Sequence, residues 1–280
     1  PLQDTRLRDL LLVALYQLQY SKAAKYAVVD HAVNAAKQIN VATGGLVNAV
    51  LRNYLRKEAS LIQLATQTDE GRYSYPQWWI NAVKAQYGEK ASAILEAGNQ
   101  HPPMALRVNM RCTTPEKYSA QLTSLGIAAE LIAPHALLLK TPLAVERLPG
   151  FFDGMVSVQD TGAQYAASLL DVQKGMRILD VCAAPGGKSA HLLESCDIEL
   201  VAVDKDEQRL ERVRENLQRL KLAATLICGD AADPMQWWDG KVFERILADV
   251  PCSASGVVCR HPDIKWLRRV TDIESFAQQQ

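Results

Sequence analysis

A tight turn that joins an acid to a cysteine is the first feature of this sequence that could do chemistry. The turn is Asp249-Val250-Pro251-Cys252, and its proline limits the freedom of the loop because the ring fixes φ. A cysteine thiolate can attack an electron-poor carbon and form a covalent intermediate. From these residues alone, Cys252 is the candidate nucleophile and Asp249 is the acid beside it.

A strand-turn-helix pattern earlier in the chain predicts a cofactor loop. The run from Arg177 to Ser189 begins as a short buried strand, turns at Pro185-Gly186-Gly187 and continues as a helix. Backbone N–H groups at the start of a helix can hold an anionic or polar group, and glycine allows such a group to approach closely. The predicted cofactor-binding residues of this loop are Cys182, Ala183, Ala184, Pro185, Gly186, Gly187 and Lys188.

Three interpretations compete for this loop. The dinucleotide fingerprint G-x-G-x-x-G is absent, since only Gly186 and Gly187 are present. The phosphate-binding pattern G-x-x-x-x-G-K-S/T nearly fits at Gly187-Lys188-Ser189, but Cys182 stands in place of its first glycine. An ordinary strand-to-helix turn without a ligand is the third.

Acids that follow the later strands favour a cofactor-binding loop over a turn without a ligand. Asp204 ends the next predicted strand, 18 positions after Gly186, and an acid about 20 residues after such a loop is where related folds bind a ribose. Asp230 and Asp249 follow two further predicted strands. Ligands of doubly wound sheets bind over the carboxyl ends of the strands, so all three acids are predicted to contact the cofactor. Helix capping explains one such acid more easily than the series.

Four motifs of this chain resemble, in order and spacing, those of a known enzyme group. They are D-V-C-A-A-P-G-G-K, V-D-K-D-E-Q-R, G-D-A and I-L-A-D-V-P-C-S-A-S-G. The group is the RNA cytosine-5 methyltransferases of the Nol1/Nop2/Sun type. The further motif R-H-P-D-I-K-W at Arg260 to Trp266 strengthens the resemblance to its bacterial Sun/Fmu (RsmB) family. The resemblance implies S-adenosylmethionine (SAM) as cofactor and small-subunit ribosomal RNA as substrate. One departure is Glu244, where the family usually has Asp, and we expect no functional cost from it.

The resemblance changes the role expected for Cys252. In this family a second cysteine, in a T-C-S motif on a later strand, is the nucleophile, and the P-C cysteine assists product release. The 280 residues contain no T-C-S motif. Because the chain starts at Pro1 and stops at Gln280 inside predicted helices, we expect a fragment, cut at both ends, that binds cofactor but cannot complete catalysis. Lys188 is expected to pair with Asp249 or to offset charge near the reacting base.

The predicted fold is multidomain. Three apolar stripes over residues 1–66 predict a small helical bundle, and the run G-G-L-V-N-A-V-L-R within it resembles the NusB-like RNA-binding domain of the family. The resemblance implies that residues 67–155 form a small α+β connecting segment and that residues 156–280 form an α/β Rossmann-like SAM-dependent methyltransferase domain. Aromatic residues around Pro76 are expected to open a helix that reaches Tyr87. They could stack on RNA bases, but packing between domains is the favoured role. Gln159 is a weaker candidate for approaching the substrate.

Charge gives modest support for an RNA partner. The chain has 31 Lys and Arg against 31 Asp and Glu, whereas residues 1–60 hold eight against four, a net of +4. Asn48, Arg52 and Asn53 could therefore touch RNA, or could be merely structural. A basic patch just after the catalytic turn is expected to contact phosphates and to make binding salt-dependent. Its predicted RNA-binding residues are Arg260, His261, Lys265, Arg268 and Arg269.

Composition also excludes some classes of protein. No apolar run approaches the ~18 residues of a membrane span, and the six scattered cysteines include no C-x-x-C pair. We therefore predict a cytoplasmic monomer with reduced thiols and without a metal site. Two other functions stay open: a P-loop-like NTPase, which would need Lys188 and Ser189 on phosphates and Mg²⁺, and a noncatalytic RNA-binding protein on a methyltransferase scaffold.

Overall fold

The computed structural model describes residues 4–280, so the first three residues of the predicted helical domain lie outside the described part of the chain. The chain divides into two compact units, one that ends at Asn99 and one over Gln100–Gln280. The predicted domain boundaries after residues 66 and 155 remain predictions.

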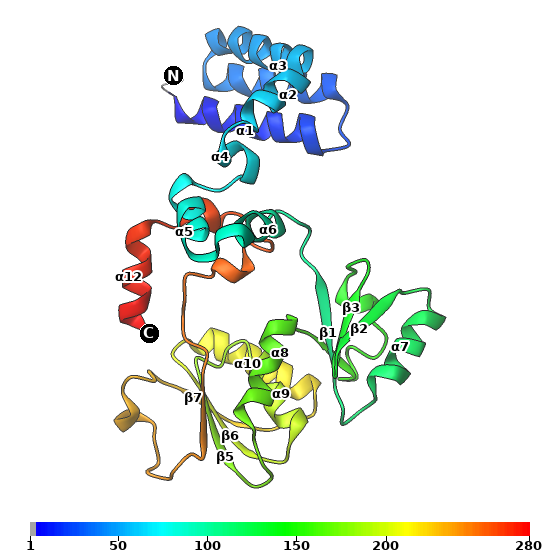
Figure 1. Ribbon diagram of the computed structural model, residues 1–280, viewed down its shortest axis with the longest axis vertical. Coiled ribbons are helices and arrows are strands. Elements are labelled where there is room, and N and C mark those ends of the chain that lie inside the picture. Colours follow the sequence, from blue (N-terminus) through cyan, green and yellow to red (C-terminus); the bar gives the residue numbers. More distant parts are fainter. Residues whose placement is uncertain (1–3) are drawn as a thin grey trace. The chain divides into compact units, whose positions relative to one another are not determined.

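The first unit opens with three helices (Figure 1): α1 (Thr5–Tyr20), α2 (Lys25–Ile39) and α3 (Gly44–Ala65), with a 3₁₀ turn η1 (Val41–Thr43) between the last two. Apolar residues three and four positions apart give each helix one buried stripe. The stripes meet in one core, whose fully packed members include Leu11, Ala36, Val47 and Leu51. The three predicted helical stripes are therefore confirmed.

Short helices complete this unit: α4 (Asp69–Tyr73), α5 (Gln77–Tyr87), η2 (Gly88–Lys90) and α6 (Ala91–Ala97). The aromatic residues around Pro76 contact one another, and α5 reaches Tyr87 as predicted. Tyr75 and Trp79 are buried, and their ring centroids lie 5.6 Å apart in an edge-on arrangement.

The second unit contains a small antiparallel sheet, in the order β2-β3-β1-β4. Its strands are β1 (Met104–Val108), β2 (Ala129–Ala133), β3 (Ala136–Leu139) and β4 (Val156–Val158). One face is covered by α7 (Pro115–Ser124), whose Tyr118 and Leu122 are fully buried against the strands; η3 (Val145–Arg147) precedes β4. Every residue of β1 is buried.

The same unit contains a parallel sheet in the order β7-β6-β5-β8. The strands are β5 (Arg177–Val181), β6 (Glu199–Asp204), β7 (Thr225–Cys228) and β8 (Arg245–Ala248). The helices α8 (Thr161–Leu170), α9 (Gly187–Ser195) and α10 (Glu207–Arg219) accompany it. The chain then runs through η4 (Pro234–Gln236), η5 (Ser255–Val257), α11 (Ile264–Leu267) and α12 (Val270–Gln279).

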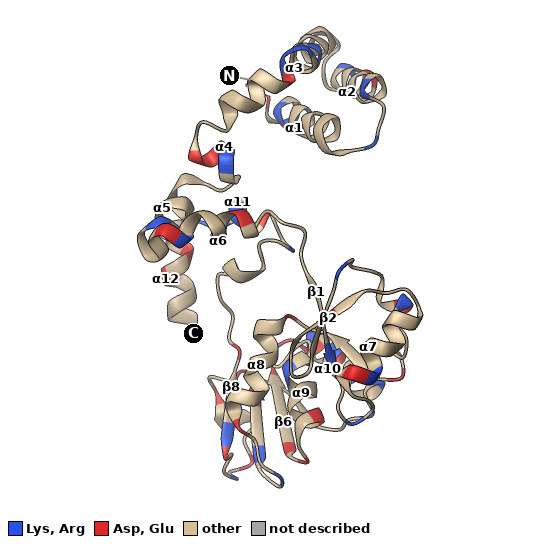
Figure 2. Ribbon diagram, turned by 45° about the vertical axis from the view of Figure 1, so that its right-hand side comes forward, with Lys and Arg blue, Asp and Glu red and all other residues tan. Residues whose placement is uncertain are grey.

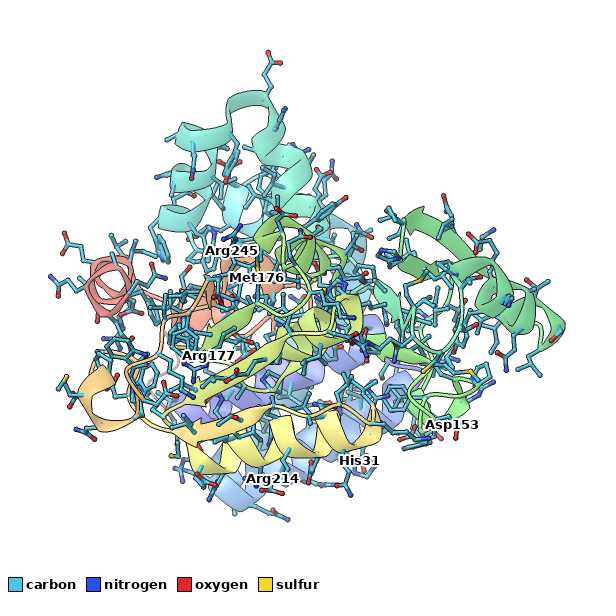
Figure 3. All side chains as sticks on the ribbon, turned by 90° about the horizontal axis from the view of Figure 1, so that it is seen from below. His31, Asp153, Met176, Arg177, Arg214 and Arg245 are labelled. Atoms are coloured by element: carbon cyan, nitrogen blue, oxygen red, sulfur yellow. The ribbon has the colours of Figure 1, made fainter. Side chains whose placement is uncertain are left out.

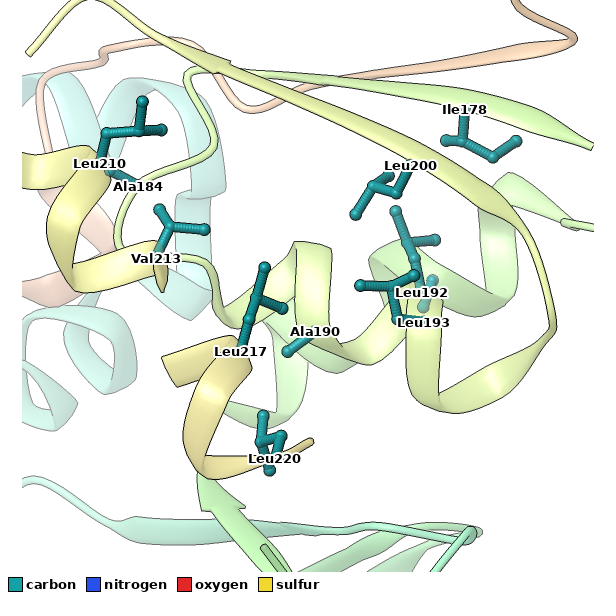
Figure 4. Close-up of a cluster of buried hydrophobic side chains, with 11 residues drawn as sticks. Ile178, Ala184, Ala190, Leu192, Leu193, Leu200, Leu210, Val213, Leu217 and Leu220 are labelled. Carbon is teal, nitrogen blue, oxygen red and sulfur yellow. The ribbon is translucent and has the colours of Figure 1, made fainter. Parts of the chain in front are cut away.

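Buried aliphatic side chains join α9 and α10 to this sheet (Figure 4). Leu210, Val213 and Leu217 form the buried face of α10. At the amino ends of the strands, Arg177 and Arg245 occupy the first positions of β5 and β8 (Figure 3). The backbone N–H of Arg177 donates to the Glu244 carboxylate at 2.7 Å, so the residue that departs from the family pattern supports the strand pairing.

Both kinds of charge occur on the helices of each unit (Figure 2). Within residues 4–280, no helix is long and apolar enough to cross a membrane.

Candidate cofactor and catalytic site

The cofactor loop leaves β5 through two unusual backbone conformations. Cys182 has φ of +57° and Gly186 has φ of +91°, and α9 begins at the next residue, Gly187. A Cβ atom on Gly186 would lie 2.9 Å from Cγ1 of Val213 and 3.1 Å from its Cα atom. Position 186 therefore requires glycine both for its φ and for the close approach of α10.

Asp204 ties the end of β6 to this loop. Its side chain is buried, and its two carboxylate oxygens accept the backbone N–H groups of Ala184 and Asp206, each at 3.1 Å. Arg209 lies 3.8 Å from the same carboxylate and donates to the Ala184 carbonyl at 3.0 Å. A carboxylate has about four lone-pair sites, so Asp204 can hold the loop and still accept hydroxyl groups.

Asp230 has a different setting. It is exposed and follows the end of β7, where its carboxylate accepts the backbone N–H of Ala232 at 2.9 Å. Its carbonyl accepts the indole N–H of Trp237 at 2.7 Å. The side chain therefore stabilises its own turn, and its predicted contact with a cofactor remains a prediction.

The structure brings the cofactor loop and the catalytic turn together. Lys188, in the first turn of α9, forms an ion pair with Asp249, which directly follows β8. This is the pairing that the sequence analysis raised. Cys252 is exposed three residues later, and its Sγ accepts the backbone N–H of Ala254 at 3.4 Å. The acid and the thiol of the turn thus lie beside the start of α9.

Asp180, on β5, is the first residue of the D-V-C-A-A-P-G-G-K motif and is a candidate site residue for which no role was predicted. It is 1% exposed, and its Oδ2 accepts the hydroxyl of Ser189 at 2.5 Å. Its Oδ1 is buried without a hydrogen-bond partner among residues 4–280. Burial raises the pKa of Asp180 to about 6, opposed by the Ser189 hydrogen bond and assisted by the charge of Asp249. A buried carboxyl group with an unused oxygen suits a cationic or donor group of a ligand.

Asp180→Asn is expected to stabilise the chain at neutral pH. Because the pKa is higher in the folded state, the folded chain binds more protons than the unfolded chain between about pH 4 and pH 6, and the free energy of unfolding falls as the pH rises through that window. Asparagine avoids this penalty and can still accept the Ser189 hydroxyl. In the absence of ligand, the gain should be about 3 kcal/mol near pH 8 and about half of that near pH 5. Urea unfolding of both proteins at the two pH values measures it, and an equal gain at both would contradict it.

The five residues of the predicted basic patch do not form one exposed surface. His261 and Arg269 are exposed, whereas Lys265 is 3% exposed and burial lowers its pKa. Arg260 donates to Asp160 at 3.3 Å and to the Pro103 carbonyl at 3.1 Å. Arg268 donates to the Ser253 carbonyl at 2.9 Å. Lys265 is thus buried, and the RNA-binding role predicted for the five residues remains a prediction.

The candidate RNA-contacting residues of α3 lie together. Arg52 donates to the side-chain oxygen of Asn48 at 2.9 Å, one helical turn away, and Arg52 is exposed. Asn53 is half-buried beside them. The contact is compatible with either role that the sequence left open.

A cavity of about 330 Å³ lies along α8 and α9 and beside the β2–β3 turn. None of the predicted site residues lines it. His191, on its wall, is buried, and burial lowers its pKa to about 3, with Arg107 and His135 acting in the same direction. The imidazole is therefore neutral at physiological pH.

The six cysteines are all free thiols. Within residues 4–280, no group of three or more His, Cys, Asp or Glu side chains is arranged to hold a metal ion.

Family models match three parts of the chain. Residues 167–280 match the 16S rRNA methyltransferase RsmB/F model, residues 75–146 match the RsmF/B-like ferredoxin-like domain, and residues 3–56 match the NusB family. The small antiparallel sheet thus falls largely within the ferredoxin-like match. The NusB match covers α1, α2 and the first part of α3.

Named relatives agree with these matches. The chain is 50% identical over 278 residues to ribosomal RNA small subunit methyltransferase B of Vibrio cholerae, covering 97% of this chain and 63% of that protein. For the protein of the same name from Serratia proteamaculans, the identity is 48% over 275 residues, with 97% and 64% covered. The chain thus spans less than two thirds of the length of these relatives.

Solved structures share the fold. A methyltransferase homolog protein from Pyrococcus horikoshii has a TM-score of 0.61 at 26% identity, with 74% of this chain and 66% of that chain covered. NSun6 from the same organism, solved with SFG, has a TM-score of 0.64 at 20% identity, with 72% and 77% covered. The parallel sheet, with its glycine loop and its acids at the strand ends, agrees with the family matches and with the identity over nearly the whole chain. The chain therefore belongs to the RsmB/F family of 16S rRNA methyltransferases.

Proposed function

We propose that this chain is the cofactor-binding part of an enzyme that methylates carbon 5 of a cytosine in small-subunit ribosomal RNA, with SAM as the methyl donor. Family membership supports methyl transfer, and the relatives' shared name, ribosomal RNA small subunit methyltransferase B, supports the RNA substrate. The NusB-family match over residues 3–56 supports a helical domain that helps to bind RNA. We also propose that the protein acts as a monomer in the cytoplasm.

The buried, hydrogen-bonded Asp204 is the observation that carries the cofactor assignment. SAM has a ribose diol, a carboxylate and two cationic groups, the ammonium and the sulfonium. Asp204 would accept the ribose hydroxyls, and the backbone N–H groups at the start of α9 would receive the carboxylate. The unpartnered Oδ1 of Asp180 and the carboxylate of Asp249 supply negative charge for the cations. The residues present therefore fit SAM.

The catalytic assignment rests on the Lys188–Asp249 pair, which places the thiol turn beside the cofactor loop. Carbon 5 of cytosine is a weak nucleophile. A thiolate that adds to carbon 6 shifts an electron pair onto carbon 5, which then can take the electrophilic methyl group that SAM supplies when bound. A base next removes the carbon-5 proton, and the thiolate leaves from carbon 6.

Asp249 and Cys252 are the residues of this chain proposed to act on the pyrimidine. Asp249 would contact the N3/N4 edge of the ring, and Lys188 would hold Asp249 in place through the ion pair. By the family resemblance, Cys252 assists product release, and the thiolate that adds to carbon 6 belongs to a T-C-S motif, which these 280 residues do not contain.

The NTPase alternative is disfavoured by Ser189. A P-loop serine must reach Mg²⁺ with its hydroxyl, but Ser189 is fully buried and donates to Asp180. Lys188, which would hold the phosphates, pairs instead with Asp249. A noncatalytic RNA-binding scaffold has no need of a thiol turn beside a cofactor loop, and it is separated from the enzyme by cofactor affinity.

Calorimetric titration of the chain with SAM, with ATP–Mg²⁺ as the matched control, tests the proposal. We expect micromolar SAM binding and no heat from ATP–Mg²⁺. Binding of ATP instead would overturn the methyltransferase assignment. Binding of neither, by a chain that unfolds cooperatively, would favour the noncatalytic scaffold.

A further inference from the structure

Arg107 reaches from the small antiparallel sheet to the start of α9, although nothing in its sequence neighbourhood marks it. It lies on β1 and is 1% exposed. Its Nε and Nη2 donate to the two carboxylate oxygens of Glu194 at 2.9 and 2.8 Å. Its Nη1 donates both to the side-chain oxygen of Gln159, at 2.6 Å, and to the backbone carbonyl of Gly187, at 2.7 Å.

The two hydrogen bonds of Nη1 join the Gly187 carbonyl, at the end of the cofactor loop, to the side chain of Gln159. Gly187 is the first residue of α9 and directly follows Gly186. Gln159 follows β4; its N–H donates to the Ala105 carbonyl at 3.1 Å, and its carbonyl accepts the Gln164 side chain at 3.0 Å. Gln159 is thus fixed to β1 and α8, so Nη1 anchors Gly187 to a rigid point outside the parallel sheet.

Stabilisation of the folded state is a weak explanation for the buried ion pair between Arg107 and Glu194. A buried ion pair is often replaceable by apolar residues of similar size without loss of stability, because desolvation of the two charges offsets their attraction. An arginine fork, by contrast, fixes geometry, since its N–H groups lie in one rigid plane. Four N–H···O bonds on one guanidinium fix Gly187 relative to Gln159 and Glu194.

We propose that Arg107 is a positioning residue for the cofactor loop. By holding the Gly187 carbonyl, it sets the direction of the backbone N–H groups at the start of α9, and the small sheet thereby takes part in cofactor binding. The inference rests on the proposed function, because that function gives the loop a ligand.

Two variants separate positioning from plain stability. Arg107→Met leaves the Glu194 carboxylate buried without a partner, and should lower the melting temperature strongly. The double variant Arg107→Met/Glu194→Met removes both charges and should recover most of that loss. Its SAM dissociation constant should nevertheless stay about tenfold above that of the parent, the equivalent of one lost charge-assisted hydrogen bond. Amide hydrogen exchange over residues 183–190, measured without SAM, should stay correspondingly faster.

Arg111→Lys is the matched control. Arg111 contacts the other end of α9, through the Glu194 carbonyl at 3.2 Å and Asp197 at 2.7 Å. We expect parental loop exchange and SAM affinity from this variant. Arg107→Lys is a second probe that keeps the buried charge, but one ammonium cannot span Glu194, Gln159 and Gly187 together. It should fold and still show faster loop exchange.

The outcomes are distinct. A double variant, or Arg107→Lys, with parental loop exchange and parental affinity would overturn the inference and leave Arg107 as a structural residue only. If the parent chain does not bind SAM, the proposed function fails, and the exchange measurements still decide whether Arg107 holds the loop.

Discussion

Replacement of Asp204 by alanine should weaken SAM binding by two to three orders of magnitude. The variant loses the carboxylate proposed to accept the ribose hydroxyls. It also leaves the Ala184 N–H without its acceptor, so the loop loses its tie to β6. Hydrogen bonds to a charged group contribute about 1.5–3 kcal/mol each, and each 1.4 kcal/mol changes the affinity about tenfold. The loss of the two hydrogen bonds from the ribose hydroxyls therefore accounts for the expected change. Calorimetric titration with SAM measures it.

Asp206→Ala is the matched control for this prediction. Asp206 is the N-cap of α10, and its carboxylate accepts the backbone N–H groups of Gln208 and Arg209. Its loss should cost about 1 kcal/mol of stability and leave the SAM affinity within about twofold of the parent. If Asp204→Ala weakened SAM binding no more than Asp206→Ala, Asp204 would not be the ribose-binding acid.

The elements of the site were predictable where the information is local. Alternation of a short apolar run, an acid or glycine and an amphipathic helix marks the ends of β5 and β6, because these two strands are buried and α10 buries one face only. The offset of Asp204 from Gly186 is set by one βαβ unit, and so it too is readable from the sequence. The order β7-β6-β5-β8 then brings the acids to one edge of the sheet.

Other features of the site depend on contacts between distant residues. Arg107 lies 80 positions before the Gly187 carbonyl that it holds, and no local pattern reports such a pair. The raised pKa of Asp180 arises from burial, which cannot be predicted from the residue type alone. Lys265 is the opposite case: its charge suggests a surface residue, but the residue is buried. Long-range polar contacts and the burial of single charges are therefore what the sequence left undetermined.

Gly186→Ala should be the most destabilising single methyl group that can be added to the loop. An L-residue in the left-handed region costs about 1–2 kcal/mol, and φ at this position is +91°. The added Cβ would also displace Val213, which is fully buried and 2.9 Å away, and overpacking of this kind costs about 1–3 kcal/mol. Together these effects predict a loss of about 4 kcal/mol in the free energy of unfolding. Urea unfolding, followed by a probe in residues 100–280, measures it.

Gly175→Ala separates the two causes. Gly175 has a similar φ of +84°, but a Cβ added there meets no atom within 4 Å. This variant should therefore lose only the conformational part, about 1–2 kcal/mol, and should bind SAM as the parent does. The difference between the two glycine variants reports the close approach of α10 to the loop. If Gly186→Ala lost no more stability than Gly175→Ala, Val213 would yield to the methyl group, and the contact between loop and helix would not be what requires glycine at position 186.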